Sequence, residues 1–135
     1  MVDLQELLTY LPQKDPVAFV KEVLICEEHV SRTRVSFESI PTLAMLSEAG
    51  AQTSIFLKLT KEKIDANIPP RAMGMLLSVK SKWQRRCEVQ AFEIESHYVS
   101  NLDNFFVVSF SVYDDNCLVA DGQVSVILEK NGESL

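Results

Sequence analysis

The sequence predicts an α+β domain in which an antiparallel sheet curls around one long helix. Two observations carry this prediction. Residues 43–59 are apolar or small nearly all round a helix, and a helix of that kind is enclosed on most sides. Segments with near-alternating β-branched and aromatic residues flank this run, two before it and four after it. A sheet that wraps one helix satisfies both periodicities.

The elements before the long helix are predicted from turn residues and alternation. A short helix is expected at residues 3–10, and the two prolines of residues 11–16 enforce an extended turn after it. Two strands follow, at residues 18–26 and 29–37, with Glu27 and Glu28 at the turn between them.

The long helix is predicted over residues 42–60, followed by a loop over residues 61–71 that contains two adjacent prolines. Pro41 and Thr42 suit the start of this helix, because proline fits the first turn and threonine can cap. The other strands are expected at residues 73–86, 89–99, 104–113 and 118–129, with turns at 101–103 and 114–116.

Composition restricts the class of protein. The length of 135 residues fits one domain, predicted over residues 1–130, with a flexible tail at 131–135. No apolar run is long enough for a membrane span, and the first residues lack the pattern of a signal peptide. Three cysteines without Cys-x-x-Cys spacing indicate reduced thiols in a cytoplasmic protein, with no disulfide and no metal site. The net charge of −6 argues against nucleic-acid binding.

Glu48 is the most informative residue, because it places a carboxylate in the middle of the apolar helix. Burying a lone carboxylate costs free energy, so such a residue usually has a partner or a chemical role. Two structural interpretations stay open. Glu48 can lie on a solvated edge of the helix, and Gln52, one turn further on, can hold it by a hydrogen bond.

Two short motifs resemble a known family. Residues 48–52, Glu-Ala-Gly-Ala-Gln, are similar to the Glu-Ala-x-Ala-Gln of the central helix in 3-hydroxyacyl-thioester dehydratases of the hot-dog fold. Residues 11–16, Leu-Pro-Gln-Lys-Asp-Pro, resemble the opening Leu-Pro-His-Arg-x-Pro of that family, with Gln13 at the histidine position. The resemblance covers nearly the whole chain. It implies a hot-dog fold, a homodimer with its sheets edge to edge, and pockets at the dimer interface.

One departure from the family pattern bears on activity. The dehydratases carry a histidine in a His-Phe-Pro-Gly-like loop before the central helix, whereas residues 36–41 contain neither histidine nor glycine. The two histidines of the chain, His29 and His97, are interpreted as ordinary surface or edge residues. Dehydration needs a base and an acid, and Glu48 alone serves both roles poorly. The favoured function is therefore acyl-thioester binding by a degenerate, dehydratase-like protein with little or no dehydratase activity.

Two alternatives remain open at this stage: an enzyme that uses Glu48, either a thioesterase or a dehydratase with a substitute acid, and a non-enzymatic interaction scaffold. The expected ligand is an acyl group on coenzyme A or on the phosphopantetheine arm of an acyl carrier protein, and no other cofactor is expected. Glu48 is the catalytic candidate. The candidate ligand-binding residues are Pro41, Thr42, Gln52 and a basic cluster that consists of Lys80, Lys82, Arg85 and Arg86. This basic cluster is either a solvated strand end or a docking site for phosphates or for an acidic carrier.

Overall fold

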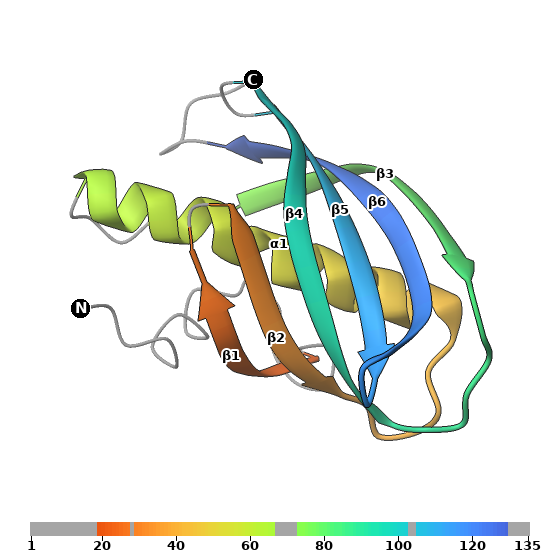
Figure 1. The fold of residues 1–135 in the computed structure, drawn as a ribbon. Helices are drawn as coiled ribbons and strands as arrows, with labels where there is room; N and C mark the ends of the chain where they lie inside the picture. The colour runs from red at the N-terminus through yellow and green to blue at the C-terminus, as the bar shows by residue number, and fades with distance from the viewer. Residues whose placement is uncertain (1–18, 28, 67–72, 103–104, 130–135) are drawn as a thin grey trace.

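One helix packs against a six-stranded antiparallel sheet in the part of the chain that the structure describes (Figure 1). This computed structural model describes residues 19–27, 29–66, 73–102 and 105–129, and side chains are discussed only for residues 19–27, 29–54, 78–100, 105–125 and 127. The short helix predicted at residues 3–10, the turn at 11–16 and the tail at 131–135 lie outside the described residues.

The strands follow the order β1-β2-β4-β5-β6-β3, and every neighbouring pair is antiparallel. The helix α1 contacts all six strands, which curve around it (Figure 1). The bounds of the elements are β1 Val20–Cys26, β2 Val30–Ser36, α1 Leu43–Ala66, β3 Met73–Trp83, β4 Ala91–Leu102, β5 Phe105–Asp114 and β6 Cys117–Glu129.

The type and order of the predicted elements agree with these bounds, with three corrections. The strand predicted at residues 73–86 is wrong for residues 84–86, which follow the end of β3 at Trp83. The predicted loop at residues 61–71 is wrong for residues 61–66, which continue α1. Lys61, Glu62 and Lys63 are good helix formers, and the two prolines on which the loop prediction rests lie further along the chain, at positions 69 and 70. The turn predicted at 101–103 is wrong for Asn101 and Leu102, which still pair with β5.

The turn predicted at residues 114–116 is confirmed. β5 ends at Asp114 and β6 begins at Cys117, so two residues connect them. Asp115 and Asn116 have φ values of 49° and 69°. Two positive φ values in a two-residue loop are typical of the turn that matches the twist of the flanking strands, and Asn and Asp tolerate this conformation.

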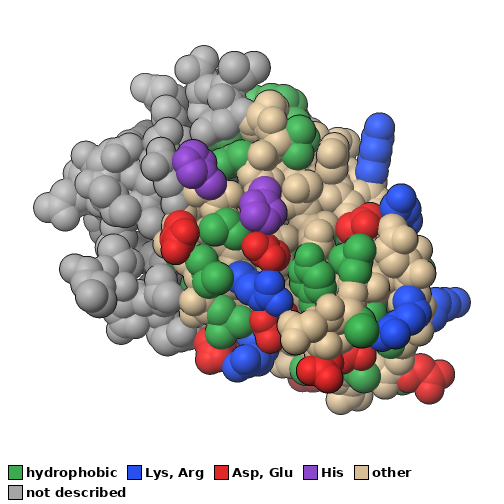
Figure 2. All heavy atoms as spheres, in the orientation of Figure 1, with side chains coloured by type: hydrophobic (Ala, Val, Ile, Leu, Met, Phe, Trp, Pro, Cys, Tyr) green, Lys and Arg blue, Asp and Glu red, His purple; other side chains and the backbone are tan. Residues whose placement is uncertain are grey.

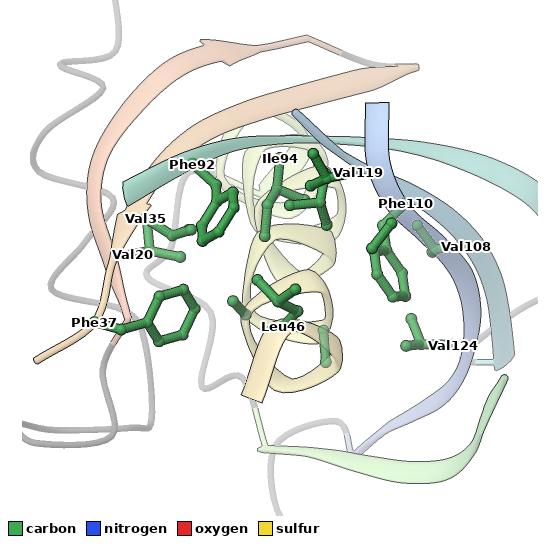
Figure 3. Close-up of a cluster of buried hydrophobic side chains, with 14 of the residues drawn as sticks. Val20, Val35, Phe37, Leu46, Phe92, Ile94, Val108, Phe110, Val119 and Val124 are labelled. Atoms are coloured by element: carbon green, nitrogen blue, oxygen red, sulfur yellow. The ribbon is translucent and has the colours of Figure 1, made fainter. Parts of the chain in front are cut away.

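The hydrophobic core lies between the sheet and α1. Alternate residues of β5 (Phe106, Val108, Phe110 and Val112) are buried, and the helix contributes Leu46 and Ala49 from the opposite side. Figure 3 shows Phe110 of β5, Phe92 of β4 and Val124 of β6 grouped around Leu46 of the helix. The ring of Phe110 is confined between two glycines. A Cβ atom at Gly50 would lie 2.7 Å from that ring, and one at Gly122 would lie 2.9 Å from it.

Hydroxyl groups also join the helix to the sheet. Thr33 Oγ1 and Thr53 Oγ1 lie 2.8 Å apart in a buried hydrogen bond, and Ser31 Oγ donates to the Thr53 carbonyl oxygen at 2.9 Å. Thr53 Oγ1 itself donates to the Ala49 carbonyl oxygen one turn earlier. These bonds fix α1 against β2, because a buried polar group that loses its partner is costly.

Charged side chains lie interspersed on the outer face of the sheet, which is the face turned away from α1 (Figure 2). Arg32 donates to Glu93 at 2.8 Å and to Glu95 at 2.9 Å, and its guanidinium group lies 5.1 Å from the centre of the Tyr113 ring. The hydrogen bond to Glu93 is the main reason why the pKa of Arg32 is raised. No helix in the described part of the chain is long and apolar enough to cross a membrane.

Candidate functional site

Glu48 lies in the second turn of α1 at the border of its buried face. Its side chain is half-buried, whereas Gln52 is fully buried. The Gln52 amide group joins two partners: Nε2 donates to Glu48 Oε1 at 3.4 Å, and Oε1 accepts from the Phe19 backbone N–H at 2.9 Å. Gln52 therefore connects the Glu48 carboxylate to the chain segment that enters β1.

The start of the helix lies one turn before Glu48. Thr42 Oγ1 accepts a hydrogen bond from the Met45 N–H at 3.2 Å, and the Thr42 carbonyl oxygen accepts from the Leu46 N–H at 3.1 Å. Thr42 is therefore the N-cap that the sequence predicts. Pro41 is buried and Thr42 is exposed, so the two residues occupy different environments in the same loop.

Ser47 and Ser81 form a contact that sequence reasoning missed. Their hydroxyl oxygens lie 2.7 Å apart, and Ser47 Oγ also lies 2.9 Å from the Leu43 carbonyl oxygen. This contact attaches the first turns of α1 to β3, on the inner face of the sheet. Alternation within residues 78–83 could have placed Ser81 inward, but only the strand order brings it to the helix.

The basic cluster lies at the end of β3 and in the segment after it. Lys80, Lys82, Arg85 and Arg86 are all exposed. Arg86 lies over the ring of Trp83, 5.6 Å from its centre, and Trp83 also packs against the core. In the same segment, burial raises the pKa of the Cys87 thiol, and the charge of Asp114 adds to that increase. The described cysteines, Cys26, Cys87 and Cys117, form no disulfide bond with one another.

The structure brings Glu48 and Gln52 together, but it places the basic cluster elsewhere in the same chain. Gln52 contacts the start of β1, whereas Lys80 and Lys82 belong to β3. These two strands are the opposite edges of the sheet. Ser81 of β3 does reach Ser47, the neighbour of Glu48, but Lys80 and Lys82 alternate with Ser81 and project from the opposite face of the sheet.

Both histidines lie away from Glu48. His29 is exposed at the bend before β2, and the His97 side chain is 53% exposed on the outer face, with Nε2 3.2 Å from Glu95 Oε1. Both are visible in Figure 2, which shows the face opposite to the helix. The interpretation of the histidines as surface residues agrees with these positions. Among the described residues, no group of three or more His, Cys, Asp or Glu side chains could hold a metal ion.

Comparisons with known proteins show the fold. No model of a known protein family matches the sequence, and no curated protein matches it. Solved structures do match. The dehydratase heterocomplex ApeI:P from Xenorhabdus doucetiae superposes with a TM-score of 0.78 at 14% identity, over 92% of this chain and 91% of that chain. Zebra fish thioesterase superfamily member 2 superposes with a TM-score of 0.72 at 13% identity, over 96% of this chain and all of that chain.

The chain has the hot-dog fold. A further hot-dog structure, described as a hypothetical thioesterase with coenzyme A from Streptococcus pneumoniae TIGR4, superposes with a TM-score of 0.62 at 8% identity, over 81% of this chain and 85% of that chain. At such identities the likeness establishes the fold and not the activity, because one fold hosts many functions. The activity of this hot-dog domain must be argued from its own residues.

Proposed function

We propose that this hot-dog domain binds a fatty acyl thioester, carried by coenzyme A or by the phosphopantetheine arm of an acyl carrier protein, and has little or no dehydratase activity of its own. The observation that carries the proposal is the Glu48–Gln52 pair on the helix of a hot-dog fold, with no histidine in the loop before that helix. Solved neighbours described with coenzyme A or bound to acetyl CoA support the class of ligand.

Dehydration of a 3-hydroxyacyl thioester needs two groups on the substrate. A base removes a proton from the α-carbon, and an acid protonates the hydroxyl group that leaves as water. Glu48 can take one of these roles. The loop residues 37–42 offer Glu38, Ser39 and Thr42 but no imidazole, and the described histidines face away from the helix. Binding without efficient dehydration is therefore the function that these residues support best.

The binding pocket is proposed to need a second chain, as the family resemblance implies for hot-dog dimers. Glu48 and Gln52 would line the pocket, and Pro41 and Thr42 would shape the entrance at the start of the helix. Because the basic cluster lies at the other edge of the sheet, its role toward a bound phosphate depends on how the two chains meet. A cytoplasmic location remains a prediction from the sequence.

Calorimetric titration with a non-hydrolysable long-chain acyl-coenzyme A analogue tests the proposal. The wild type should bind, and Glu48→Gln should also bind, because the substitution keeps the shape of the side chain and removes only its charge. Replacing the four residues of the basic cluster by Gln should weaken binding most at low salt, where surface attraction is least screened. If neither the wild type nor Glu48→Gln binds at millimolar ligand, the domain is better described as an interaction scaffold.

A second candidate function is thioester hydrolysis, in which the half-buried Glu48 carboxylate near the start of α1 would act on the thioester. Hydrolysis requires less than dehydration, because one carboxylate can orient the attacking water while helix amides hold the carbonyl oxygen. Release of free thiol from an acyl-coenzyme A measures it directly, and Glu48→Gln should abolish it. Dehydratase turnover by the unmodified protein at about 1–10³ s⁻¹ would instead show that other residues act.

A further inference from the structure

A hollow with a volume of about 470 Å³ lies over the three neighbouring strands β5, β6 and β3. Lys80 and Lys82 alternate with Ser81, which points to α1, so these lysines project from the outer face. The hollow is therefore on the face opposite to the helix and to Glu48. It is lined by Lys80, Ser81, Lys82, Ser109, Phe110, Ser111, Asp121, Gly122 and Gln123.

The strand register arranges the polar lining in two rows. In the Lys80 row, Lys80 pairs with Gln123, and Gln123 pairs with Ser109. These three side chains offer an ammonium group, an amide and a hydroxyl as hydrogen-bond donors, with no carboxylate among them. Donors from three adjacent strands thus converge on one side of the hollow, in a chain whose net charge is −6.

The Lys82 row is mixed in charge. Lys82 pairs with Asp121, and Asp121 pairs with Ser111. Asp121 Oδ2 already accepts a hydrogen bond from Gln84 Nε2 at 3.0 Å. An anion in the hollow would be attracted by Lys82 and repelled by Asp121, so its favoured position is nearer to the Lys80 row.

The floor of the hollow is formed by backbone. Phe110 is buried in the core, Gly122 has no side chain, and the Ser81 side chain contacts Ser47 on the inner face. Ser109 and Ser111 are short, so they leave space above the sheet that the longer Lys80 and Lys82 side chains border. The resulting volume exceeds that of a single phosphate group and falls within the usual range of small-molecule sites.

We propose that this hollow binds the phosphate ester of a small molecule, with the phosphate held by Lys80, Gln123 and Ser109. Phosphate presents several acceptor oxygens and therefore suits donors that arrive from three strands, and charge-assisted hydrogen bonds from lysine are among the stronger ones. The inference does not rest on the acyl-thioester proposal, because the hollow and Glu48 lie on opposite faces of the sheet.

Calorimetry at low ionic strength with adenosine 3′,5′-bisphosphate and with inorganic pyrophosphate tests this site. The wild type should bind the bisphosphate. Lys80→Gln should weaken that binding by about tenfold, the typical loss for one hydrogen bond to a charged group. Asp121→Asn should strengthen it, because the change removes a like charge and keeps an acceptor for Gln84. Lys21→Gln is the matched control, since Lys21 is also an exposed basic residue but belongs to β1, at the opposite edge of the sheet, and does not line the hollow.

Three outcomes would overturn the proposal: no binding of either probe, equal effects of Lys80→Gln and Lys21→Gln, or succinate binding as tightly as pyrophosphate. The last result would indicate an unselective basic surface. Binding of pyrophosphate as well as the bisphosphate would show that the phosphate alone is recognised. An acyl-pantetheine without phosphate separates the two proposals. If the acyl-pantetheine binds and the bisphosphate does not, the phosphate site in the hollow is refuted and the acyl-thioester function stands. If the bisphosphate binds and the acyl-pantetheine does not, the acyl-thioester function is refuted and the phosphate site stands.

Discussion

At the scale of single residues, two glycines determine how closely the helix approaches the sheet. Gly50 faces the Phe110 ring from α1, and Gly122 faces the same ring from β6. Phe110 is 1% exposed, so its ring has little room to move away. In a closely packed core, added atoms force side chains or backbone out of their preferred positions.

We expect Gly50→Ala to lower the free energy of unfolding by about 1–3 kcal/mol, the usual cost of overpacking a core. Helix propensity alone would change it in the opposite direction by about 1 kcal/mol. Urea denaturation measures the difference. The double variant Gly50→Ala with Phe110→Leu should recover part of the loss of Gly50→Ala, because the smaller side chain makes room for the added methyl group. A Gly50→Ala variant at least as stable as the wild type would contradict the contact.

The candidate site shows what single residues can predict. Glu48 and Gln52 are one helical turn apart, so their contact follows from the sequence once the segment is helical. The Thr42 cap is equally local. The partner of Gln52 at Phe19 is not local, because the bond crosses 33 residues and depends on where β1 meets the helix.

At the scale of elements, the fit of α1 on β2 depends on hydroxyl pairs as well as on apolar contacts. Leu46, Ala49 and Gly50, which belong to the apolar or small run predicted at residues 43–59, are buried. The pairing of Thr33 with Thr53 was not predicted, since it requires the register of β2 relative to the helix. Threonine is common in strands as a β-branched residue, so its presence at position 33 does not indicate a hydrogen bond to the helix.

Thr53→Val should lower the free energy of unfolding by about 1–3 kcal/mol, because it leaves the buried Thr33 hydroxyl without its partner. Adding Thr33→Val should restore much of that loss, since both polar groups are then gone. A double-mutant cycle in urea measures the coupling between the two residues. Independent, additive effects of the two substitutions would show that the hydroxyl pair contributes nothing specific.

At the scale of the whole molecule, the strand order determines which edges are open. β2 lies between β1 and β4, so the strand predicted at residues 29–37 is an inner strand. The edges are β1 and β3. Among the described strands β3 pairs only with β6, so the strand predicted at residues 73–86 lies at an edge over residues 73–83. Periodicity identifies strands but not their neighbours, so the sequence alone could not show which strands lie at the edges of the sheet.

We predict a homodimer at micromolar concentration. β3 pairs with β6 on one side only among the described strands, and such an edge strand presents a row of backbone donors and acceptors to another chain. Light scattering should give a mass near twice that of the 15.2 kDa chain. A constant monomer mass across the micromolar range would refute the dimer. It would also remove the second chain on which the proposed acyl pocket depends.

The place of β3 beside β6 also has a consequence for the kinetics of folding. β4, β5 and β6 follow one another in sequence and in the sheet, so they can pair through short turns. β3 precedes them in the chain but docks on the last of them, joining residues as distant as Met73 and Glu129. Such pairing requires the closure of a long loop and is slow relative to local contacts. The three-stranded meander can therefore form early, whereas the strand that carries Lys80 and Ser81 completes the domain late.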